Sequence, residues 1–460
     1  MTASPARRPS AGHLLALAVA LGAVLTALVT PDPGLRVLAV AAAGITAFAT
    51  RSLPEAAIAL FIFLAFLAIG AAPREVIFSG FATSGFWLLV GGLVMGAAIA
   101  ASGLGDQIAR RIFAVTGPSY ARAVWVLAIG GMLLGALVPS AIPRVIVMMP
   151  ITQALARQIG LPPGSRGHTG LLMTAAIMTL VPTYAFLTAN LPTIVEMGIV
   201  ELLYDLQVSY GTYFVQNAPI NALRFAVLLV MLRAYGRSLP APPAATATDA
   251  PAPLTAPQKR LALVLSLAVA LWATDALHGI PPAWVTLAGA MVLLLPAAGI
   301  FAPTAMKSEI DLSIAFLIAA VLSISAVMGH VGLGEAIARQ VVPALRLGPG
   351  ADGWNLTAIT LFSSALSHLT IAPAAPVILA PLVQAMADST GWTREAVVMA
   401  QNIGISTTLL PYQSPPLLIG IALAGIPVGA LTRLCLVSAL VTSLLGIPLT
   451  WAWWAWLGVI

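Results

Sequence analysis

The sequence predicts an all-α polytopic membrane protein with about eleven transmembrane helices and two re-entrant hairpins, arranged as two inverted repeats. Three observations predict this class: an unusual composition, long apolar runs interrupted at prolines, and a motif that occurs twice. Of the 460 residues, 60% are hydrophobic and only 8% are charged. Soluble proteins carry about 25% charged residues. Because so few charges cannot cover a water-facing surface, the composition excludes an ordinary soluble enzyme.

The expected elements follow from apolar runs that are bounded by charged residues or by Pro/Gly clusters. Simple spans are expected at residues 13–30, 35–50, 54–72, 80–104, 219–235, 261–278, 282–300, 311–333 and 430–457. Residues 123–160 and 355–387 are also apolar but contain Pro, Ser, Thr or His in the middle, which favours re-entrant hairpins. Residues 169–200 and 396–424 are long and interrupted by prolines, and therefore predict broken helices.

The map divides the chain into four parts. These are an N-terminal span at 1–34, a first repeat at 35–235, a linker at 236–258 and a second repeat at 259–460. The first apolar run resembles a signal peptide, but the next run follows almost at once, so we expect a retained span. The linker is rich in Ala, Pro and Thr without apolar periodicity, which indicates a flexible connection.

Basic residues between the predicted spans indicate the orientation in the membrane. If each interrupted stretch returns to the side from which it entered, most arginines and lysines fall on one side, together with Arg7 and Arg8. Positively charged loops face the cytoplasm. We therefore expect a multi-pass protein of the bacterial inner membrane, with the N-terminus and the linker in the cytoplasm.

Two short motifs recur at nearly the same spacing along the chain. The decapeptide GLGDQIARRI at 103–112 returns as GLGEAIARQV at 332–341, and PITQA at 150–154 returns as PLVQA at 381–385. An odd number of predicted crossings separates the copies, so the second copy lies upside down relative to the first. An inverted repeat around a site near the membrane midplane is the architecture of secondary transporters.

Arg144 is the most informative single residue, because it lies at membrane depth in a stretch with two prolines. Arginine keeps its charge, so a buried one needs a partner. No acidic residue is near it in the sequence. Three interpretations stay open: Arg144 extends to the cytoplasmic surface, binds an anion, or pairs with a distant carboxylate such as Asp311. Arg224, early in a span, is expected to extend outward to the membrane surface.

Polar side chains at the four interruptions are the other candidate site residues. Asn190, Gln413 and Ser414 lie at the two predicted helix breaks, where half-helix ends can bind an anion or a cation. Interhelical hydrogen bonds are the alternative role for them. His368 could titrate near neutral pH and couple transport to protons, or it could be a hydrogen-bonded structural histidine.

Several classes of function lack their sequence signals. We find no Gly-x-x-x-x-Gly-Lys-Ser/Thr loop, no His/Glu zinc spacing and no Gly-x-Ser-x-Gly elbow, so we expect neither ATP-driven transport nor an enzyme. The single cysteine, Cys435, excludes an internal disulfide. The net charge of +6 is scattered between apolar runs, which argues against a nucleic-acid partner. No cofactor is expected beyond a coupling Na⁺ or H⁺.

The pattern resembles the divalent-anion:sodium symporter (DASS) family of the ion transporter superfamily. The resemblance covers nearly the whole chain, but the family's Ser-Asn-Thr hairpin motif falls on Ser140-Ala-Ile and on Ile371-Ala-Pro, so one of its six positions is kept. The segments TANL at 188–191 and PYQSP at 411–415 look like degenerate versions of the family's unwound segments. Alanine offers no side-chain oxygen, so sodium coupling and a dicarboxylate substrate do not follow from the resemblance.

What the resemblance implies is a homodimer in lipid, with a fixed scaffold and a mobile transport domain that carries a carboxylate or sulfate. It also implies one ion site in each half, and the candidate coupling-ion ligands are Pro139, Ser140, Thr188, Ser364 and Thr408. Arg144 suggests that a fixed guanidinium charge takes the place of the sodium ion that the family uses.

Together, these inferences predict a secondary active transporter that moves a small carboxylate, sulfonate or sulfate-like anion by an elevator-type, cation-coupled mechanism. The candidate substrate contacts are Ser140, Ala141, Arg144, Asn190, Ser367, His368, Thr370, Gln413 and Ser414. A proton-coupled or exchange-type transporter without sodium sites is the first alternative, and an anion channel is the second. The rival classes are an intramembrane enzyme and a lipid-interacting structural protein.

Overall fold

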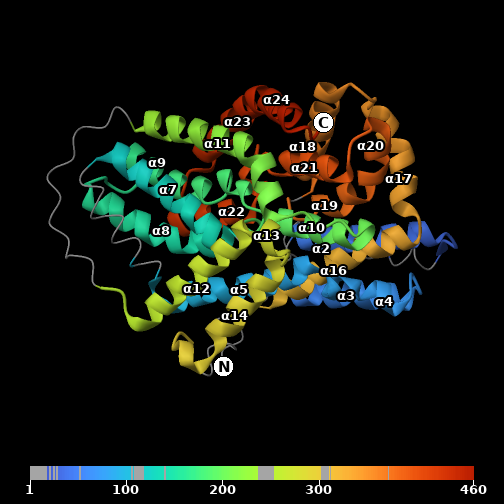
Figure 1. Ribbon diagram of the computed structural model, residues 1–460, viewed down its shortest axis with the longest axis horizontal. Helices are drawn as coiled ribbons and strands as arrows, with labels where there is room; N and C mark the ends of the chain where they lie inside the picture. The colour runs from blue at the N-terminus through green and yellow to red at the C-terminus, as the bar shows by residue number, and fades with distance from the viewer. Residues whose placement is uncertain are drawn as a thin grey trace.

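A computed structural model places the chain as a bundle of helices (Figure 1). It describes residues 18–19, 22–23, 26, 29–50, 53–104, 107, 119–138, 141–236, 253–301, 310, 312–370 and 372–460. Every regular element within these ranges is helical, which confirms the predicted all-α class.

The first half of the chain contributes eleven described elements. They are α2 (Pro33–Thr50), α3 (Glu55–Ala68), α4 (Arg74–Ile77), η1 (Ser79–Ala82), α5 (Ser84–Ser102), α7 (Tyr120–Leu137), α8 (Ala141–Gln158), α9 (Arg166–Met178), η2 (Pro182–Ala185), α10 (Leu191–Tyr204) and α11 (Tyr210–Tyr235). Side-chain caps fix several starts: the Thr83 hydroxyl accepts the Phe86 amide at the start of α5.

The second half follows a similar order. It contains α12 (Ala256–Ala273), α13 (Asp275–His278), α14 (Pro282–Leu294), η3 (Pro296–Ala298), α16 (Ser313–His330), α17 (Leu333–Val341), η4 (Val342–Leu345), α18 (Asp352–Leu369), α19 (Ala375–Leu379), η5 (Ala380–Leu382), α20 (Val383–Thr390), α21 (Arg394–Ile405), η6 (Pro411–Gln413), α22 (Pro415–Ala424), α23 (Val428–Val441), η7 (Thr442–Gly446) and α24 (Ile447–Leu457). The segment η7 is a turn of π-helix that joins α23 to α24.

By length and composition, five helices in the described ranges could cross a membrane. They are Ser84–Ser102, Tyr120–Leu137, Tyr210–Tyr235, Ser313–His330 and the continuous rod Val428–Leu457. Shorter apolar helices include α3, α14 and α22. The number of crossings stays a prediction, as do the boundaries of the two repeats.

One predicted boundary is wrong. The span expected to begin at residue 219 begins at Tyr210, where the Ser209 hydroxyl accepts the Thr212 amide, and Pro219 lies inside α11. The apolar-run criterion missed this first part because it carries Gln216 and Asn217. Both side chains are buried in the protein and do not face lipid, so a polar residue there does not end the helix.

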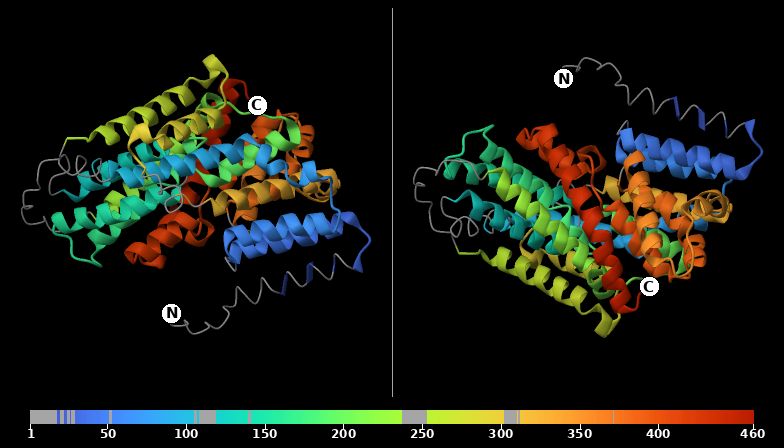
Figure 2. Two further views of the ribbon diagram at one scale, coloured as in Figure 1. Left: turned by 90° about the horizontal axis from the view of Figure 1, so that it is seen from below. Right: turned by 90° about the horizontal axis from the view of Figure 1, so that it is seen from above.

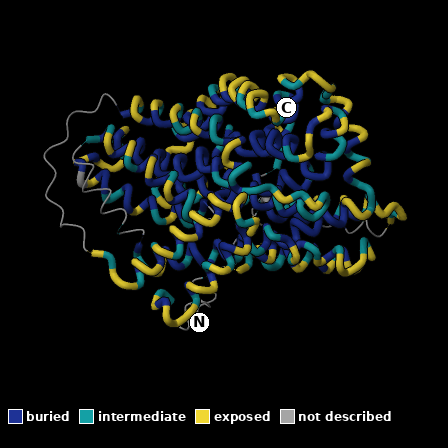
Figure 3. Tube along the Cα trace, in the orientation of Figure 1, coloured by how far each residue is buried: buried dark blue, intermediate teal, exposed yellow. Residues whose placement is uncertain are grey.

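Long helices pack in two corresponding pairs. Helix α5 packs closely on α14, and α3 packs on α16. The α5–α14 contact depends on a missing side chain, because a Cβ on Gly91 would lie 2.9 Å from Cγ2 of Thr286. Figure 2 shows these helices from two further sides. Buried residues run through the middle of the molecule and exposed ones cover its outside (Figure 3).

Other elements form two helical pairs and two interrupted helices. Helices α7 and α8 pair with each other, as do α18 and α19. The α7–α8 pair lies towards one end of the long axis and α18 with α20 towards the other (Figure 1). Helix α9 continues through η2 into α10, and α21 continues through η6 into α22. Both interruptions fall at prolines, which remove a backbone donor and stop a regular helix.

Candidate functional site

All four interruptions line one small cavity, which has about 40 Å³ of free space for a water-sized molecule. The α7–α8 turn contributes Ala141 and Ile142, and the turn between α18 and α19 contributes Ala372 and Pro373. The two helix breaks contribute the other lining residues: Leu180, Tyr184, Asn190, Leu191, Pro192, Ser414, Pro415 and Pro416. Segments that are far apart in the sequence therefore form one site.

Three helices begin at this cavity. Helix α8 begins at Ala141, α10 at Leu191 and α22 at Pro415. Asn190 and Ser414 occupy the N-cap positions of α10 and α22, and neither side chain makes a capping hydrogen bond. Helix N-termini carry partial positive charge. The first two residues of α22 are prolines without an amide proton, so this helix contributes its dipole and no free amide there. Because no ionisable residue except Tyr184 lines the described cavity, these ends favour a negatively charged group there.

The Arg144 guanidinium connects α8 to the first helix break. Its Nη2 donates to the Ala189 carbonyl at 2.7 Å and to Asn190 Oδ1 at 3.1 Å. Arg144 is only 1% exposed, so it does not extend to the membrane surface. Its Nε and Nη1 atoms have no hydrogen-bond partner in the structure. A buried charge with two free donors is suited to an additional acceptor.

Asn190 is held in one orientation at the edge of the cavity. Its Oδ1 accepts from Arg144, and its Nδ2 donates to Thr183 Oγ1 at 3.2 Å. Thr183 belongs to η2 and donates its own proton to the Leu180 carbonyl at 2.6 Å. The side-chain amide of Asn190 therefore connects the Arg144 guanidinium to Thr183 in the first break.

A second buried guanidinium holds the second helix break, and it corrects the expectation for Arg224. This side chain is 1% exposed and does not extend outward. Its Nη1 donates to Ser406 Oγ at 2.8 Å and to Asn221 Oδ1 at 3.1 Å. Its Nη2 donates to Thr407 Oγ1 at 2.9 Å and to the Ile403 carbonyl at 3.1 Å. The polar acceptors at the break draw the guanidinium inward, which the apolar surroundings in the sequence did not indicate.

The turn after α18 is hydrogen-bonded to the second break. Gln413 Nε2 donates to Ser367 Oγ at 2.8 Å, and the Ala372 amide donates to the Gln413 carbonyl. His368 Nε2 accepts the Leu409 amide at 3.2 Å. Ser367, His368 and Gln413 therefore join the two elements and do not line the cavity.

The other predicted positions lie outside the cavity lining. Thr370 donates to the Leu366 carbonyl, and Thr188 is buried with no partner for its hydroxyl oxygen. Ser364 is buried in α18. Thr408 lies in a separate small cavity beside Arg224. Pro139 and Ser140 lie outside the described residues, as does Asp311. The described ranges hold no cluster of three His, Cys, Asp or Glu that could bind a metal.

Four buried residues near the breaks escaped the sequence analysis: Tyr184, Glu196, Tyr213 and Asn402. The Tyr213 hydroxyl lies 2.8 Å from Asn402 Oδ1 and 2.9 Å from the Tyr184 carbonyl oxygen, and it donates its single proton to one of them at a time. Asn402 Nδ2 donates to Glu196 Oε2 at 2.8 Å. The available signal was Glu196 itself, the one acidic residue in the apolar run LPTIVEMGIV at 191–200.

This arrangement of helices and breaks defines a membrane transporter, and comparison with known proteins supports that class. Residues 12–460 match the family model described as the sodium:sulfate symporter transmembrane region. The chain therefore belongs to the sodium:sulfate symporter family, which confirms the predicted DASS resemblance. A relative described as a membrane protein, from Cupriavidus necator, is 25% identical over 434 residues, which cover 87% of this chain and 84% of the relative.

Two solved transporters share the fold. The YdaH transporter of Alcanivorax borkumensis, described as having an unusual topology, superposes with a TM-score of 0.61 at 18% identity, covering 88% of this chain and 99% of that one. MtrF of Neisseria gonorrhoeae, described as illuminating a class of antimetabolite efflux pumps, superposes with a TM-score of 0.57 at 14% identity, covering 94% and 97%.

Proposed function

We propose that this chain is a secondary active transporter of a small anion in the bacterial inner membrane. The observation that carries the proposal is the cavity between the four interruptions, where helices α8, α10 and α22 begin. A site at the meeting point of broken helices is the arrangement by which secondary transporters bind substrate. The N-terminus lies in the cytoplasm, and the chain works as a homodimer with an elevator-type movement.

The charge around the cavity favours an anion over a cation. Arg144 is connected to the lining through Asn190, and Arg224 lies at the second break. Among the described residues, neither guanidinium has a carboxylate as a hydrogen-bond partner. A carboxylate, sulfonate or sulfate bound at the helix ends supplies the missing negative charge. Ser414, Asn190 and the amides at the start of α8 are the proposed contacts, and Ser140, which lies outside the described residues, stays a predicted contact.

The family's description makes sulfate the first probe. The experiment reconstitutes the purified chain into vesicles and follows radiolabelled sulfate, succinate and a small alkylsulfonate. We expect saturable uptake and counterflow of at least one of them. Flux without saturation or counterflow would indicate a channel, and no binding of any anion in a thermal-shift screen would contradict the proposal.

Arg144→Ala tests the anion site through Asn190, because Arg144 donates to Asn190 but does not itself line the cavity. Loss of charged hydrogen bonds costs about 1.5–3 kcal/mol each, so we expect uptake to fall by about tenfold to a hundredfold. Arg144→Lys keeps the charge but loses the two-acceptor geometry and should be intermediate. Arg157→Ala is the matched control, because Arg157 lies on the same helix and is exposed. Full activity of both Arg144 variants would remove this residue from the mechanism.

A further inference from the structure

Glu196 is a carboxyl group buried in the helix that leaves the first break. It lies in the second turn of α10 and is 0% exposed. Its Oε2 accepts one hydrogen bond, from Asn402 Nδ2 at 2.8 Å, and its Oε1 has no partner in the structure. No basic side chain among the described residues contacts it. Burying an ionised carboxylate with a single amide donor is strongly unfavourable.

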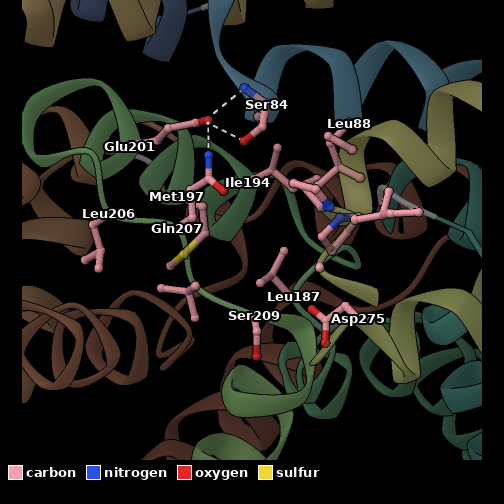
Figure 4. Close-up of a pocket in the computed structure, with 17 residues that line it drawn as sticks. Ser84, Leu88, Leu187, Ile194, Met197, Glu201, Leu206, Gln207, Ser209 and Asp275 are labelled. Carbon is pink, nitrogen blue, oxygen red and sulfur yellow. Dashed lines mark hydrogen bonds between the residues drawn. The ribbon is translucent and has the colours of Figure 1, made fainter. Parts of the chain in front are cut away.

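Two other acidic residues, Glu201 and Asp275, have more hydrogen-bond donors. Glu201 lies nearer the end of α10 and is half-buried. It accepts from the Ser84 amide, the Ser84 hydroxyl and Gln207 Nε2 (Figure 4). Asp275 accepts the amides of Tyr210 and Gly211 at the start of α11. Each of these groups has several donors. Glu196 differs from them because it has one donor and no access to water.

The elements packed against α10 contain few titratable groups. These elements are α5, α16, α19, α21, η1 and η5, and their only ionisable residues are His330, Arg394 and Glu395. His330 is exposed, Arg394 lies over the Tyr204 ring of α10, and Glu395 accepts from Gln216. Closer to Glu196 lie Tyr213 and Tyr184, both near Arg224. None of these groups forms an ion pair that would hold Glu196 ionised.

A chain of polar groups connects Glu196 to the cavity. Asn402 donates to Glu196, and the Tyr213 hydroxyl lies between Asn402 Oδ1 and the Tyr184 carbonyl, donating its one proton to either. Tyr184 lines the cavity. Asn402 lies near the end of α21, just before the second break, whereas Tyr184 lies in the first break. Glu196 is therefore connected through polar neighbours to residues at both breaks.

We propose that Glu196 is the proton-binding site that couples anion transport to protons. In this conformation it is the neutral acid. One proton from water binds the Glu196 carboxylate on one side of the membrane and returns to water on the other, and no bond in the anion changes. An ionised Glu196 would repel an anion in the cavity, so protonation and anion binding favour each other. This inference rests on the proposed function.

Infrared spectroscopy tests the protonation state without any substrate. An ordinary glutamate, with a pKa of about 4.3, is ionised at pH 7. In wild-type protein in lipid at about pH 7 we expect the carbonyl band of a protonated carboxyl, and we expect Glu196→Gln to lack it. Glu395→Gln is the matched control, since Glu395 lies on the adjacent α21 and is partly exposed. No band in wild type, or an unchanged band in Glu196→Gln, would overturn the proposal.

Should Glu196→Gln fold poorly, Asn402→Leu provides a second test. It removes the one hydrogen-bond donor that Glu196 has among the described residues, so the band should shift in frequency. A band that neither shifts nor disappears belongs to another group and contradicts the assignment.

Transport provides the functional test. With radiolabelled sulfate, we expect a pH gradient to drive accumulation in wild type and in Glu395→Gln, and this accumulation to be lost in Glu196→Gln. Undiminished accumulation by Glu196→Gln would overturn the inference. If wild type carries none of the tested anions, the proposed function fails, while the infrared result still decides whether Glu196 is protonated.

Discussion

Two buried arginines each hold one helix break, but the sequence indicated only one of them. Arg144 stood out because it lies between prolines in an apolar stretch. Arg224 lies in an ordinary apolar run, and its acceptors Ser406 and Thr407 are far away in the chain. A contact across such a distance has no local signature. Glu196 escaped for a related reason, because its hydrogen-bond partner Asn402 is far away in the chain.

Arg224→Gln should destabilise the protein at the second break. It leaves Ser406, Thr407 and the Ile403 carbonyl without their guanidinium donor. Because these bonds involve a charged group, their loss should lower the free energy of unfolding by about 2–4 kcal/mol. The measurement is the midpoint of thermal unfolding in detergent, which should fall. Arg233→Gln, on the exposed end of the same helix, should leave the midpoint unchanged. Equal midpoints for the two variants would show that Arg224 does not hold the break.

At the scale of elements, the prolines predicted both breaks, and the structure has α9–η2–α10 and α21–η6–α22 where broken helices were expected. Composition and proline position act locally, so they are readable from sequence. How closely the elements approach one another cannot be read from the sequence. Gly404 illustrates this: a Cβ on it would lie 2.6 Å from Ser363 Cβ, at the contact between α18 and α21.

Gly404→Ala should therefore push α21 away from α18. Overfilling a close contact costs about 1–3 kcal/mol, which we expect as a lower unfolding midpoint together with slower anion uptake. Gly429→Ala is the control, because a Cβ there has no neighbour within 4 Å and alanine favours helix. If Gly404→Ala is as stable and active as Gly429→Ala, the spacing of α18 and α21 does not control the site.

At the scale of the whole molecule, both guanidinium groups come from the first half of the chain, and each lies at one of the two breaks. The family is named for sodium symport, yet here the Ala189 carbonyl and the Ile403 carbonyl already accept from arginine. A sodium ion about 4 Å from a fixed guanidinium would meet about 4 kcal/mol of repulsion at an effective dielectric constant of 20. That corresponds to about a thousandfold weaker binding. Membership of the family therefore does not by itself predict the coupling ion.

We expect anion uptake to be independent of sodium. Vesicles loaded and diluted in choline salts should take up the transported anion as fast as vesicles in sodium salts, and a sodium gradient should drive no accumulation. The same vesicles with an imposed pH gradient provide the positive control for coupled transport. Uptake that saturates with sodium concentration would show that a cation site exists elsewhere in the molecule, and it would assign the two guanidinium groups a purely structural role at the breaks.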